Sequence, residues 1–578
     1  MAPTDQLQEV KIMLHGTAAS DGIGIGKVML IEEHSLEYTP RTVTDTEAES
    51  QRFKAAVDAF CYNTEKQAEN LRSSAGEKEA EILAGHIQII KDPYLSGEIE
   101  KLIADGQCAE SALEHMCDMF IAMFSAADDE LTKQRAADVR DIKSGVLGIL
   151  LGVNEIKVSD APKGTVLAAR ELTPSVTAGI VKENIAGIIT ETGGTTSHSA
   201  ILARALEIPA VLSVEGVASS LKNGDTVVVD GSEGAVIVNP DDNTVTEYSK
   251  KRDAFLAERK ELENYRGRET KSASGEVYEL FCNIGKPEDA VKAVDADGEG
   301  VGLFRTEFLF MDRTSIPTED EQFEAYKKAA LILKGKSLII RTLDIGGDKD
   351  IPYLGLEKEE NPFMGFRAIR YCLKNRELFK SQIKAILRAS AFGDIKIMFP
   401  LITTMDELRE GKKLVAECKA DLRNMGINFN ENIQVGVMVE TASAAVIADM
   451  LAKEADFFSI GTNDLTGYTM ACDRGNNDVS YLYSPLQPSV LRMIKRTIEC
   501  GVQNGISVGM CGEAAANKLM IPLLISFGLT EFSVSAPSVL NVRKIISTWT
   551  KEEADKVTAK VLEMSTQQEI VEYLKSVV

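Results

Sequence analysis

The chain has 578 residues, of which 44% are hydrophobic and 26% charged, so it has the composition of a soluble globular protein and the length of two to four domains. Its net charge of -24 argues against nucleic-acid binding, and the absence of any apolar run of roughly 18 residues argues against a membrane span. Residues 1–5 lack the pattern of a secretory signal, and nine cysteines without a Cys-x-x-Cys pair indicate reduced thiols in the cytoplasm.

The first half of the chain alternates between strand-like and helix-like patterns. Residues 22–31 predict a turn and then a strand, and their glycine spacing does not fit a dinucleotide fingerprint. Residues 45–152 carry apolar side chains at spacings of three and four, which predicts several packed helices, whether purely structural or used to dock a partner. Short strands return over 153–245. We therefore expect one α/β domain, 10–34 and 153–245, interrupted by a helical domain over 35–152.

A histidine at a predicted helix start is the most informative feature of this half. Gly193 and Gly194 end an apolar run, and small hydroxylated residues lead to His198, after which apolar residues recur at helical spacing. A helix start offers unpaired backbone N–H groups and the positive end of the helix dipole, which favour a phosphoryl group. His198 is therefore a candidate nucleophile that becomes phosphorylated. The alternative is a capping turn with an incidental histidine.

The second half, after a charged helical linker over 246–268, contains short apolar runs separated by helical segments. Eight such runs over about 300 residues predict a (β/α)₈ barrel over 269–578, with a doubly wound open sheet as the alternative. The predicted strands are 278–283, 299–304, 337–343, 395–401, 432–439, 456–461, 506–510 and 529–534.

Polar residues stand where these predicted strands end, which is where barrels carry their catalytic groups. Among the basic residues, Arg305 and Arg341 stand at the ends of predicted strands, Arg474 comes soon after the sixth strand, and Arg367 and Arg370 lie in the segment before the fourth. Arginine binds phosphate and carboxylate in bidentate fashion, and Glu440 and Asp464 offer the hard oxygen ligands that Mg²⁺ prefers. Cys511 is either a buried small hydrophobe or a proton donor. The set suits a substrate anion that carries both phosphate and carboxylate.

Several long motifs in the same order resemble enzyme I of the phosphoenolpyruvate–sugar phosphotransferase system, over nearly the whole chain. They are Gly193-Gly194-Thr195-Thr196-Ser197-His198, residues 302–311, Asp344-Ile345-Gly346-Gly347-Asp348-Lys349, residues 460–465, Asp473-Arg474-Gly475-Asn476 and Met510-Cys511-Gly512-Glu513. The chain departs from the family's pattern at Ala514-Ala515-Ala516-Asn517, where Leu-Ala-Gly-Asp is usual.

The resemblance implies a swivelling α/β phosphohistidine domain with an inserted helical bundle, followed by a TIM-like barrel that also dimerises. It implies that His198 takes the phosphoryl group of phosphoenolpyruvate, that Thr177 hydrogen-bonds this histidine, and that Cys511 protonates the enolate of pyruvate. The helical insert would dock the histidine-containing phosphocarrier protein. The substrate ligands would be Arg305, Arg341, Arg367, Asn463, Asp464 and Arg474, and the ligands of Mg²⁺ or Mn²⁺ would be Glu440 and Asp464.

Two other readings compete with this one. Pyruvate phosphate dikinase and phosphoenolpyruvate synthase share these domains but add a large ATP-binding domain, for which residues 1–270 leave no room. A catalytically silent or regulatory paralogue is the second alternative, although the chain retains His198, the arginines, both metal ligands and Cys511.

Overall fold

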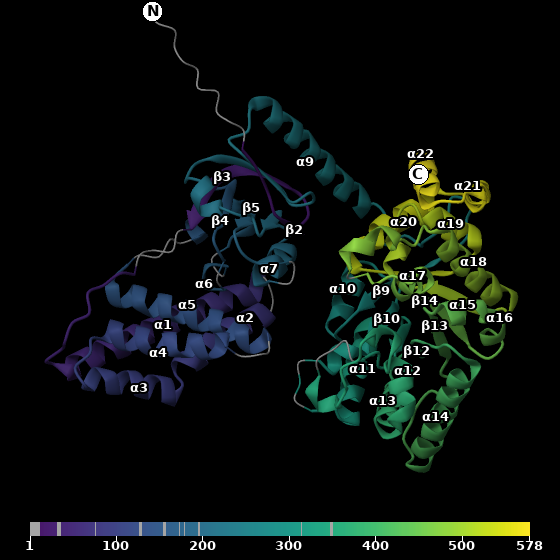
Figure 1. Cartoon of the computed structure of the whole chain (residues 1–578), viewed down its shortest axis with the longest axis horizontal. Coiled ribbons are helices and arrows are strands. Elements are labelled where there is room, and N and C mark those ends of the chain that lie inside the picture. Colours follow the sequence, from purple (N-terminus) through teal and green to yellow (C-terminus); the bar gives the residue numbers. More distant parts are fainter. Residues whose placement is uncertain are drawn as a thin grey trace, which may run out of the picture. The chain divides into compact units, whose positions relative to one another are not determined.

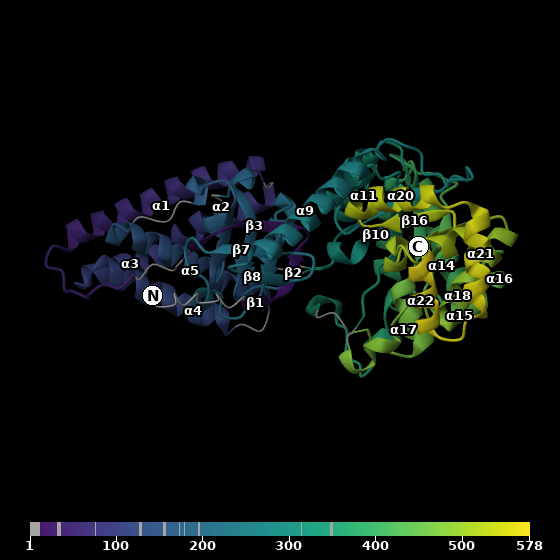
Figure 2. The ribbon, with the colours of Figure 1, turned by 90° about the horizontal axis from the view of Figure 1, so that it is seen from above.

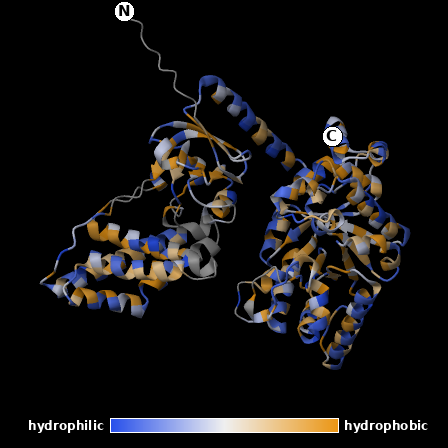
Figure 3. Cartoon of the chain, in the orientation of Figure 1, coloured by the Kyte–Doolittle hydropathy of each residue, from blue (hydrophilic) through white to orange (hydrophobic). Residues whose placement is uncertain are grey.

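The computed structural model describes residues 12–31, 36–74, 77–126, 130–153, 158–172, 174–177, 180–194, 197–311, 313, 315–346, 351–474 and 476–578. The chain forms two compact units, residues 1–259 and 260–578. The boundary lies inside helix α9 (Asp242–Glu263), which overlaps the predicted linker. This helix is mainly hydrophilic along its length (Figure 3).

The first unit contains an eight-stranded mixed sheet in the order β1-β8-β7-β3-β4-β5-β6-β2 among the described residues. Strands β3, β4, β5 and β6 pair in parallel, and the remaining pairs are antiparallel. The strands are β1 (Ile12–His15), β2 (Thr17–Ser20), β3 (Ile23–Ile31), β4 (Thr165–Ala169), β5 (Ile185–Thr190), β6 (Ala210–Leu212), β7 (Thr226–Asp230) and β8 (Ala235–Val238). Short helices α6 (Pro174–Thr177), α7 (His198–Leu206) and α8 (Val217–Ser220) connect them.

The glycine-rich segment after Asp21 forms the strand that the sequence predicts. The strand begins at Ile23, so Gly24 and Gly26 lie inside it. A Cβ atom on either glycine would come within 2.0 Å of a neighbouring carbonyl oxygen, that of Ala186 or of Gly164. Glycine is needed here for close backbone packing within the sheet.

A helical bundle is inserted between β3 and β4, as the apolar spacing predicted (Figures 1 and 2). Its helices are α1 (Thr46–Ser74), α2 (Glu77–Ile90), α3 (Pro93–Ala104), α4 (Ala109–Ser125) and α5 (Glu130–Leu151). Buried side chains from all five helices contribute to its interior, among them Phe53, Ile90, Ile99, Leu113 and Ile142. The predicted assignment of 35–152 to partner docking remains a prediction.

The second unit is a closed barrel of eight parallel strands among the described residues, which confirms the barrel and excludes the open sheet. Closure is made by the pairing of the last strand with the first, Glu531 with Glu279 through Val534 with Cys282. The strands are β9 (Glu279–Ile284), β10 (Val301–Arg305), β11 (Leu338–Arg341), β12 (Ile395–Phe399), β13 (Val435–Val439), β14 (Phe457–Ile460), β15 (Ser507–Met510) and β16 (Glu531–Val534).

Helices surround this barrel and bury a continuous core against its strands. They are α10 (Asp289–Asp295), α11 (Glu319–Leu333), α12 (Ala368–Lys374), α13 (Arg376–Ala389), α14 (Met405–Asn424), α15 (Ala442–Val446), α16 (Ala448–Leu451), α17 (Thr462–Met470), α18 (Pro488–Gln503), α19 (Ile521–Phe527), α20 (Val539–Thr548), α21 (Lys551–Glu563) and α22 (Gln567–Val577). No helix among the described residues is long and apolar enough to cross a membrane.

Candidate functional site

The site lies at the carboxyl ends of the barrel strands, where consecutive strands deliver polar side chains to one edge. Arg341 ends β11, Glu440 directly follows β13, and Asp464 lies in the first turn of α17 after β14. Because all strands are parallel, these ends meet at the same mouth of the barrel. The sequence predicted this meeting for Arg341, Arg367, Glu440 and Asp464.

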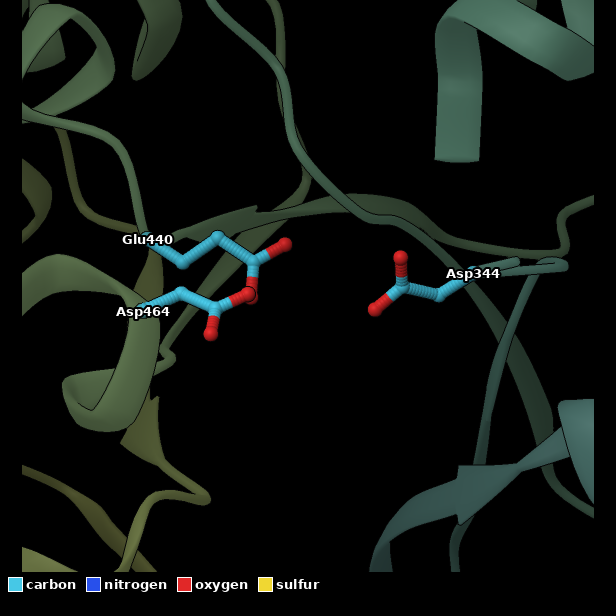
Figure 4. A group of neighbouring side chains, drawn as sticks. All are labelled: Asp344, Glu440 and Asp464. Carbon is cyan, nitrogen blue, oxygen red and sulfur yellow. The ribbon is translucent and has the colours of Figure 1, made fainter. Parts of the chain in front are cut away.

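Three carboxylates gather at this mouth. Asp344, Glu440 and Asp464 each present an oxygen, and these oxygens lie within 4.8 Å of one another. Figure 4 shows the carboxylates of Glu440 and Asp464 side by side, with that of Asp344 pointing toward them from the opposite side. Hard oxygen donors at this spacing suit a divalent cation such as Mg²⁺.

Two buried arginines neutralise part of this negative charge. Nη1 of Arg341 lies 3.0 Å from Asp344, and its Nη2 donates to Glu307 at 2.6 Å. Arg367 donates from Nε and Nη2 to Asp344 and from Nη2 to Asp464 at 3.2 Å. Burial lowers the pKa of both guanidinium groups, but the neighbouring carboxylates raise it by more than burial lowers it. Both arginines therefore stay charged.

Glu440 is the most enclosed member of the group, with 2% of its surface exposed. Burial is the largest cause that raises the pKa of this carboxyl, and the charges of Asp464 and Asp344 raise it further against the opposing arginines. Because a bound cation would remove this penalty on the charged form, the electrostatics of the site favour cation binding.

The backbone around Glu440 is shaped to hold it. Leu401 adopts a left-handed conformation, φ 55°, and its N–H donates to Glu440 Oε1 at 2.6 Å. Gly461 lies on the other side, where a Cβ atom would come within 2.8 Å of Glu440 Oε2. A non-glycine residue in the left-handed region costs on the order of 1 kcal/mol, and such strain concentrates at functional sites.

Cys511 follows β15 and faces the barrel interior. It is 6% exposed and packs in a small apolar cluster with Leu303, Ile339, Met398, Met438 and Phe457. Burial raises the pKa of this thiol to about 12, against the opposing influences of Ser459 and Arg341. The thiol is therefore protonated at neutral pH, which is the state a proton donor requires.

Three predicted substrate residues lie outside the buried cluster. Arg305 is exposed, with its guanidinium 5.0 Å from the ring centre of Phe308, and Arg474 is also exposed. Asn463 exchanges hydrogen bonds with Glu513, donating from Nδ2 at 3.2 Å and accepting from its N–H at 3.3 Å. The structure thus brings together Arg341, Arg367, Glu440 and Asp464. Arg305 pairs with Arg341 in the register of β10 and β11, and Asn463 directly precedes Asp464 in α17.

The structure describes only part of the motif around His198. His198 opens α7, and Ser197 caps this helix by accepting a hydrogen bond from the N–H of Ala200, as a capping residue does. Thr177 ends α6 and is buried. Thr195, Thr196 and the His198 side chain lie outside the described residues, as do Gly347, Asp348, Lys349 and Gly475 of the barrel motifs. The helix start predicted at His198 is confirmed.

Asp344 is the site residue that reasoning from the sequence missed. It lies three residues beyond Arg341 in the same polar stretch, and an acidic group so close to a strand end was the available signal. Arg367 pairs with it from 23 residues further along the chain, and Asp464 reaches the same group from the helix after β14. Only the folded structure shows that it joins the cluster.

The donor set fits a divalent cation. Glu440 Oε1 is used by Leu401 and Asp464 Oδ2 by Arg367, so Glu440 Oε2 and Asp464 Oδ1 are the oxygens of these two residues without a hydrogen-bond partner among the described residues. Two free carboxylate oxygens from adjacent strand ends, with water and substrate oxygens, match the way Mg²⁺ is usually held.

Comparison with known families supports this reading of the barrel. Three family models match the chain: PEP-utilising enzyme, N-terminal, over residues 15–135; PEP-utilising enzyme, mobile domain, over 161–234; and PEP-utilising enzyme, PEP-binding domain, over 259–550. Together they span both units, and the barrel corresponds to the PEP-binding domain.

Individual relatives match over nearly their full length. A phosphoenolpyruvate-protein phosphotransferase of Bacillus subtilis (strain 168) is 46% identical, over 98% of this chain and 99% of its own. The protein of the same name from Listeria innocua is 45% identical, over 97% of this chain and 98% of its own, and that of Staphylococcus carnosus is 44% identical over the same shares. These matches confirm the resemblance to enzyme I, and the chain belongs to the phosphoenolpyruvate-protein phosphotransferase family.

Proposed function

We propose that this protein transfers the phosphoryl group of phosphoenolpyruvate to His198, releases pyruvate, and passes the group to a histidine of the histidine-containing phosphocarrier protein, the first step of the sugar phosphotransferase system. The observation that carries the proposal is the buried cluster of two arginines and three carboxylates at the mouth of a barrel of this family. Such a mixed set binds an anion and a cation together, as phosphoryl transfer requires.

The first step breaks the bond between phosphorus and the enol oxygen and forms a bond between phosphorus and an imidazole nitrogen of His198. The electron pair of the broken bond remains on the oxygen as the enolate of pyruvate. Cys511, whose thiol is protonated at neutral pH, donates its proton to the terminal carbon of the enolate and gives pyruvate. Solvent then returns a proton to the thiolate. Thr177 orients His198 through a hydrogen bond.

The substrate is held by its charged groups. Arg341 and Arg367 face the cluster, and Arg305, Arg474 and Asn463 stand at its rim and complete the grip on the phosphate and carboxylate. Glu440 and Asp464 would hold Mg²⁺ or Mn²⁺, and the bound ion would neutralise charge on the phosphoryl oxygens. Asp464 thus serves the substrate and the metal together.

The helical insert supplies a surface for the phosphocarrier protein. Met119 and Met123 lie one turn apart on α4 and are 46% and 55% exposed, and Tyr94 on α3 is 61% exposed. The ring of Tyr94 contacts that of Phe120 edge to face, and Phe120 contacts Phe124 in the same way. Exposed methionine and aromatic side chains of this kind are typical of protein interfaces.

A labelling experiment tests the transfer to His198. The protein is incubated with ³²P-labelled phosphoenolpyruvate and Mg²⁺, and the wild type is compared with His198→Ala. We expect acid-labile label on the wild type only, passing onward to added phosphocarrier protein. Absence of label on the wild type, with both Mg²⁺ and Mn²⁺, would instead indicate a catalytically silent or regulatory paralogue.

A second experiment tests the docking surface. The double substitution Met119→Asp and Met123→Asp places charge on the patch, so we expect transfer to the phosphocarrier protein to slow at least tenfold while His198 is labelled at the normal rate. Met425, 64% exposed on the barrel unit, provides the control as Met425→Asp, which should leave both rates unchanged. Equal slowing in both variants would contradict the assignment.

Two further properties belong to the same proposal. The barrel exposes apolar side chains, including Met364, Met450 and Tyr481. A second copy of the chain would cover such side chains in a homodimer. Light scattering after size-exclusion chromatography measures the mass in solution and so tests for the dimer. The nine cysteines are all unpaired, which is consistent with action in the reducing cytoplasm.

A further inference from the structure

Asp344 is distinguished from the other two carboxylates by how fully its oxygens are used. Arg367 donates to Oδ1 from Nε at 3.1 Å and from Nη2 at 2.8 Å, and its Nη2 also contacts Oδ2 at 3.0 Å. The guanidinium of Arg341 lies 3.0 Å from the same Oδ2. Asp344 therefore joins Arg341, which ends β11, to Arg367, which precedes α12 in the connection between β11 and β12.

Glu440 and Asp464 are arranged differently. Each uses one oxygen for a protein contact, Glu440 with the N–H of Leu401 and Asp464 with Arg367. Their second oxygens have no hydrogen-bond partner among the described residues. The three carboxylates lie close enough to hold one ion together, but only these two have oxygens to give without releasing an arginine.

The two arginines are held from their other sides as well. Glu307 accepts from Nη2 of Arg341 at 2.6 Å. Arg367 precedes Ala368, which adopts a left-handed conformation with φ 53° and donates its N–H to Ile345, one residue beyond Asp344. Both the backbone and the side chain of Arg367 are thus tied to the segment that carries Asp344.

Each guanidinium keeps N–H groups that no carboxylate occupies. Nη1 of Arg367 contacts the hydroxyl of Tyr468 at 3.4 Å, and Nε of Arg341 is buried with no hydrogen-bond partner in the part of the chain that the structure describes. A planar guanidinium binds phosphate or carboxylate well only when its plane is fixed in the right direction. Asp344 holds Arg367 along the edge formed by Nε and Nη2, and together with Glu307 it holds the two Nη atoms of Arg341, so the plane of each guanidinium is fixed.

We propose that Asp344 is a positioning residue that orients Arg341 and Arg367 toward phosphoenolpyruvate, and that it is not itself a ligand of the metal that Glu440 and Asp464 would hold. This inference rests on the proposed function for the identity of the substrate. The role assigned to Asp344 rests on its contacts with the two arginines.

The test separates metal binding from substrate binding in the full-length protein. Free Mn²⁺ is measured by electron paramagnetic resonance without substrate, and phosphoenolpyruvate binding is measured by calorimetry with Mn²⁺ in a His198→Ala background, which prevents turnover. For Asp344→Asn we expect the Mn²⁺ dissociation constant to stay within about threefold of the parent value. Because Arg367 loses charge-assisted hydrogen bonds and Arg341 loses an ion pair, the dissociation constant for phosphoenolpyruvate should rise about 10- to 100-fold.

Glu440→Gln provides the opposite pattern, with Mn²⁺ binding weakened by more than about tenfold, since it removes a charged ligand. Kinetics in the His198-containing protein should show the Asp344→Asn effect mainly in the KM for phosphoenolpyruvate. Asp297 provides a matched control, because it pairs with the buried Arg543 away from the site. Asp297→Asn should lower the melting temperature and leave both dissociation constants unchanged.

Three outcomes overturn the inference: loss of Mn²⁺ binding in Asp344→Asn to the extent seen in Glu440→Gln, an unchanged affinity for phosphoenolpyruvate, or a tighter one. Failure of the parent protein to bind phosphoenolpyruvate would refute the proposed function instead. In that case the Mn²⁺ comparison of Asp344→Asn with Glu440→Gln would still decide whether Asp344 is a metal ligand.

Discussion

Glu531 shows how strongly a single buried residue can depend on its surroundings. It points into the barrel from β16, and its Oε1 is buried with no hydrogen-bond partner among the residues that the structure describes. A Cβ atom on Gly302 or Gly509 would come within 2.4 or 2.8 Å of this oxygen, so only glycine leaves room for the carboxyl. Burial, followed by the charge of Glu279, raises the pKa of Glu531 to about 8 against the opposing charge of Lys396.

This shift predicts a pH dependence of stability. The carboxyl of Glu531 has a pKa of about 4.5 in the unfolded chain, so the folded protein binds this proton more tightly. The stabilisation of the folded state by the bound proton is therefore complete below pH 4.5 and is lost as the pH rises through 8. Glu531→Gln should therefore flatten the fall in unfolding free energy of the barrel between pH 5 and 8, as measured by urea denaturation. The exposed Glu552 provides the control as Glu552→Gln, and an unchanged slope in Glu531→Gln would contradict the prediction.

At the scale of elements, the short connections at the barrel mouth place the site. The β14–α17 connection is a single residue, Gly461, so Asp464 reaches the cluster from the first turn of the helix. The β12 end turns sharply at Leu401 to aim its N–H at Glu440. Regular strands and helices thus carry the site, while a few strained or glycine positions aim the groups.

Gly461→Ala should disturb the metal ligands without unfolding the barrel. Its Cβ would lie 2.8 Å from both Cβ and Oε2 of Glu440, a distance that forces Glu440 to move. We expect Mn²⁺ affinity to fall by more than about threefold, measured by electron paramagnetic resonance. Gly467→Ala, on the same helix but 3.3 Å from the Cys472 carbonyl oxygen, should leave the affinity unchanged. Equal affinities in the two variants would show that Glu440 has room to adjust.

The end of α11 offers a stabilising change. Lys334 is exposed and caps this helix in a left-handed conformation, φ 52° and ψ 45°, which glycine adopts without a steric penalty. Lys334→Gly should raise the unfolding free energy of the barrel by about 0.5 kcal/mol. Glycine removes the steric cost of the left-handed conformation, but its larger conformational entropy in the unfolded chain offsets part of this gain. Ala325→Gly inside the same helix should have the opposite sign and cost about 1 kcal/mol. Denaturant titrations of the two variants give both values.

At the scale of the whole molecule, the two units have separate buried cores. One extended cluster belongs to the barrel, and the clusters of the sheet and of the helical bundle belong to residues 1–259. A core that is complete within its own unit can be lost without loss of the other. The net charge of -24 belongs to the whole chain, whereas three carboxylates meet at the site. The electrostatic potential at the site therefore depends on how these carboxylates are paired more than on the net charge.

Calorimetry should show two unfolding transitions. Phe458→Ala removes a buried ring from β14 and should lower only the transition of the barrel, since such changes cost about 3–5 kcal/mol. Val229→Ala in β7 should lower only the other transition. A single transition that moves equally in both variants would show that the two units unfold together.

Local patterns were sufficient to predict much of this protein. The helix start at His198, the bundle after residue 45, all eight barrel strands and the polar strand ends at Arg341 and Glu440 follow from spacing, capping and residue type, which act over a few residues. Recognition of the family follows from motifs in a fixed order.

Tertiary structure decided what depends on long-range geometry. Pairing of β16 with β9 chose a closed barrel over an open sheet, and closure determined which strand ends face one another. Asp344 joined the acidic cluster, while Arg305 and Arg474 remained exposed. The close approach of neighbouring backbones at Gly24 and Gly26, which requires glycine there, is visible only in the folded sheet. Charges pair across distances that only the folded chain defines, so periodicity identifies the candidates and the fold selects the partners.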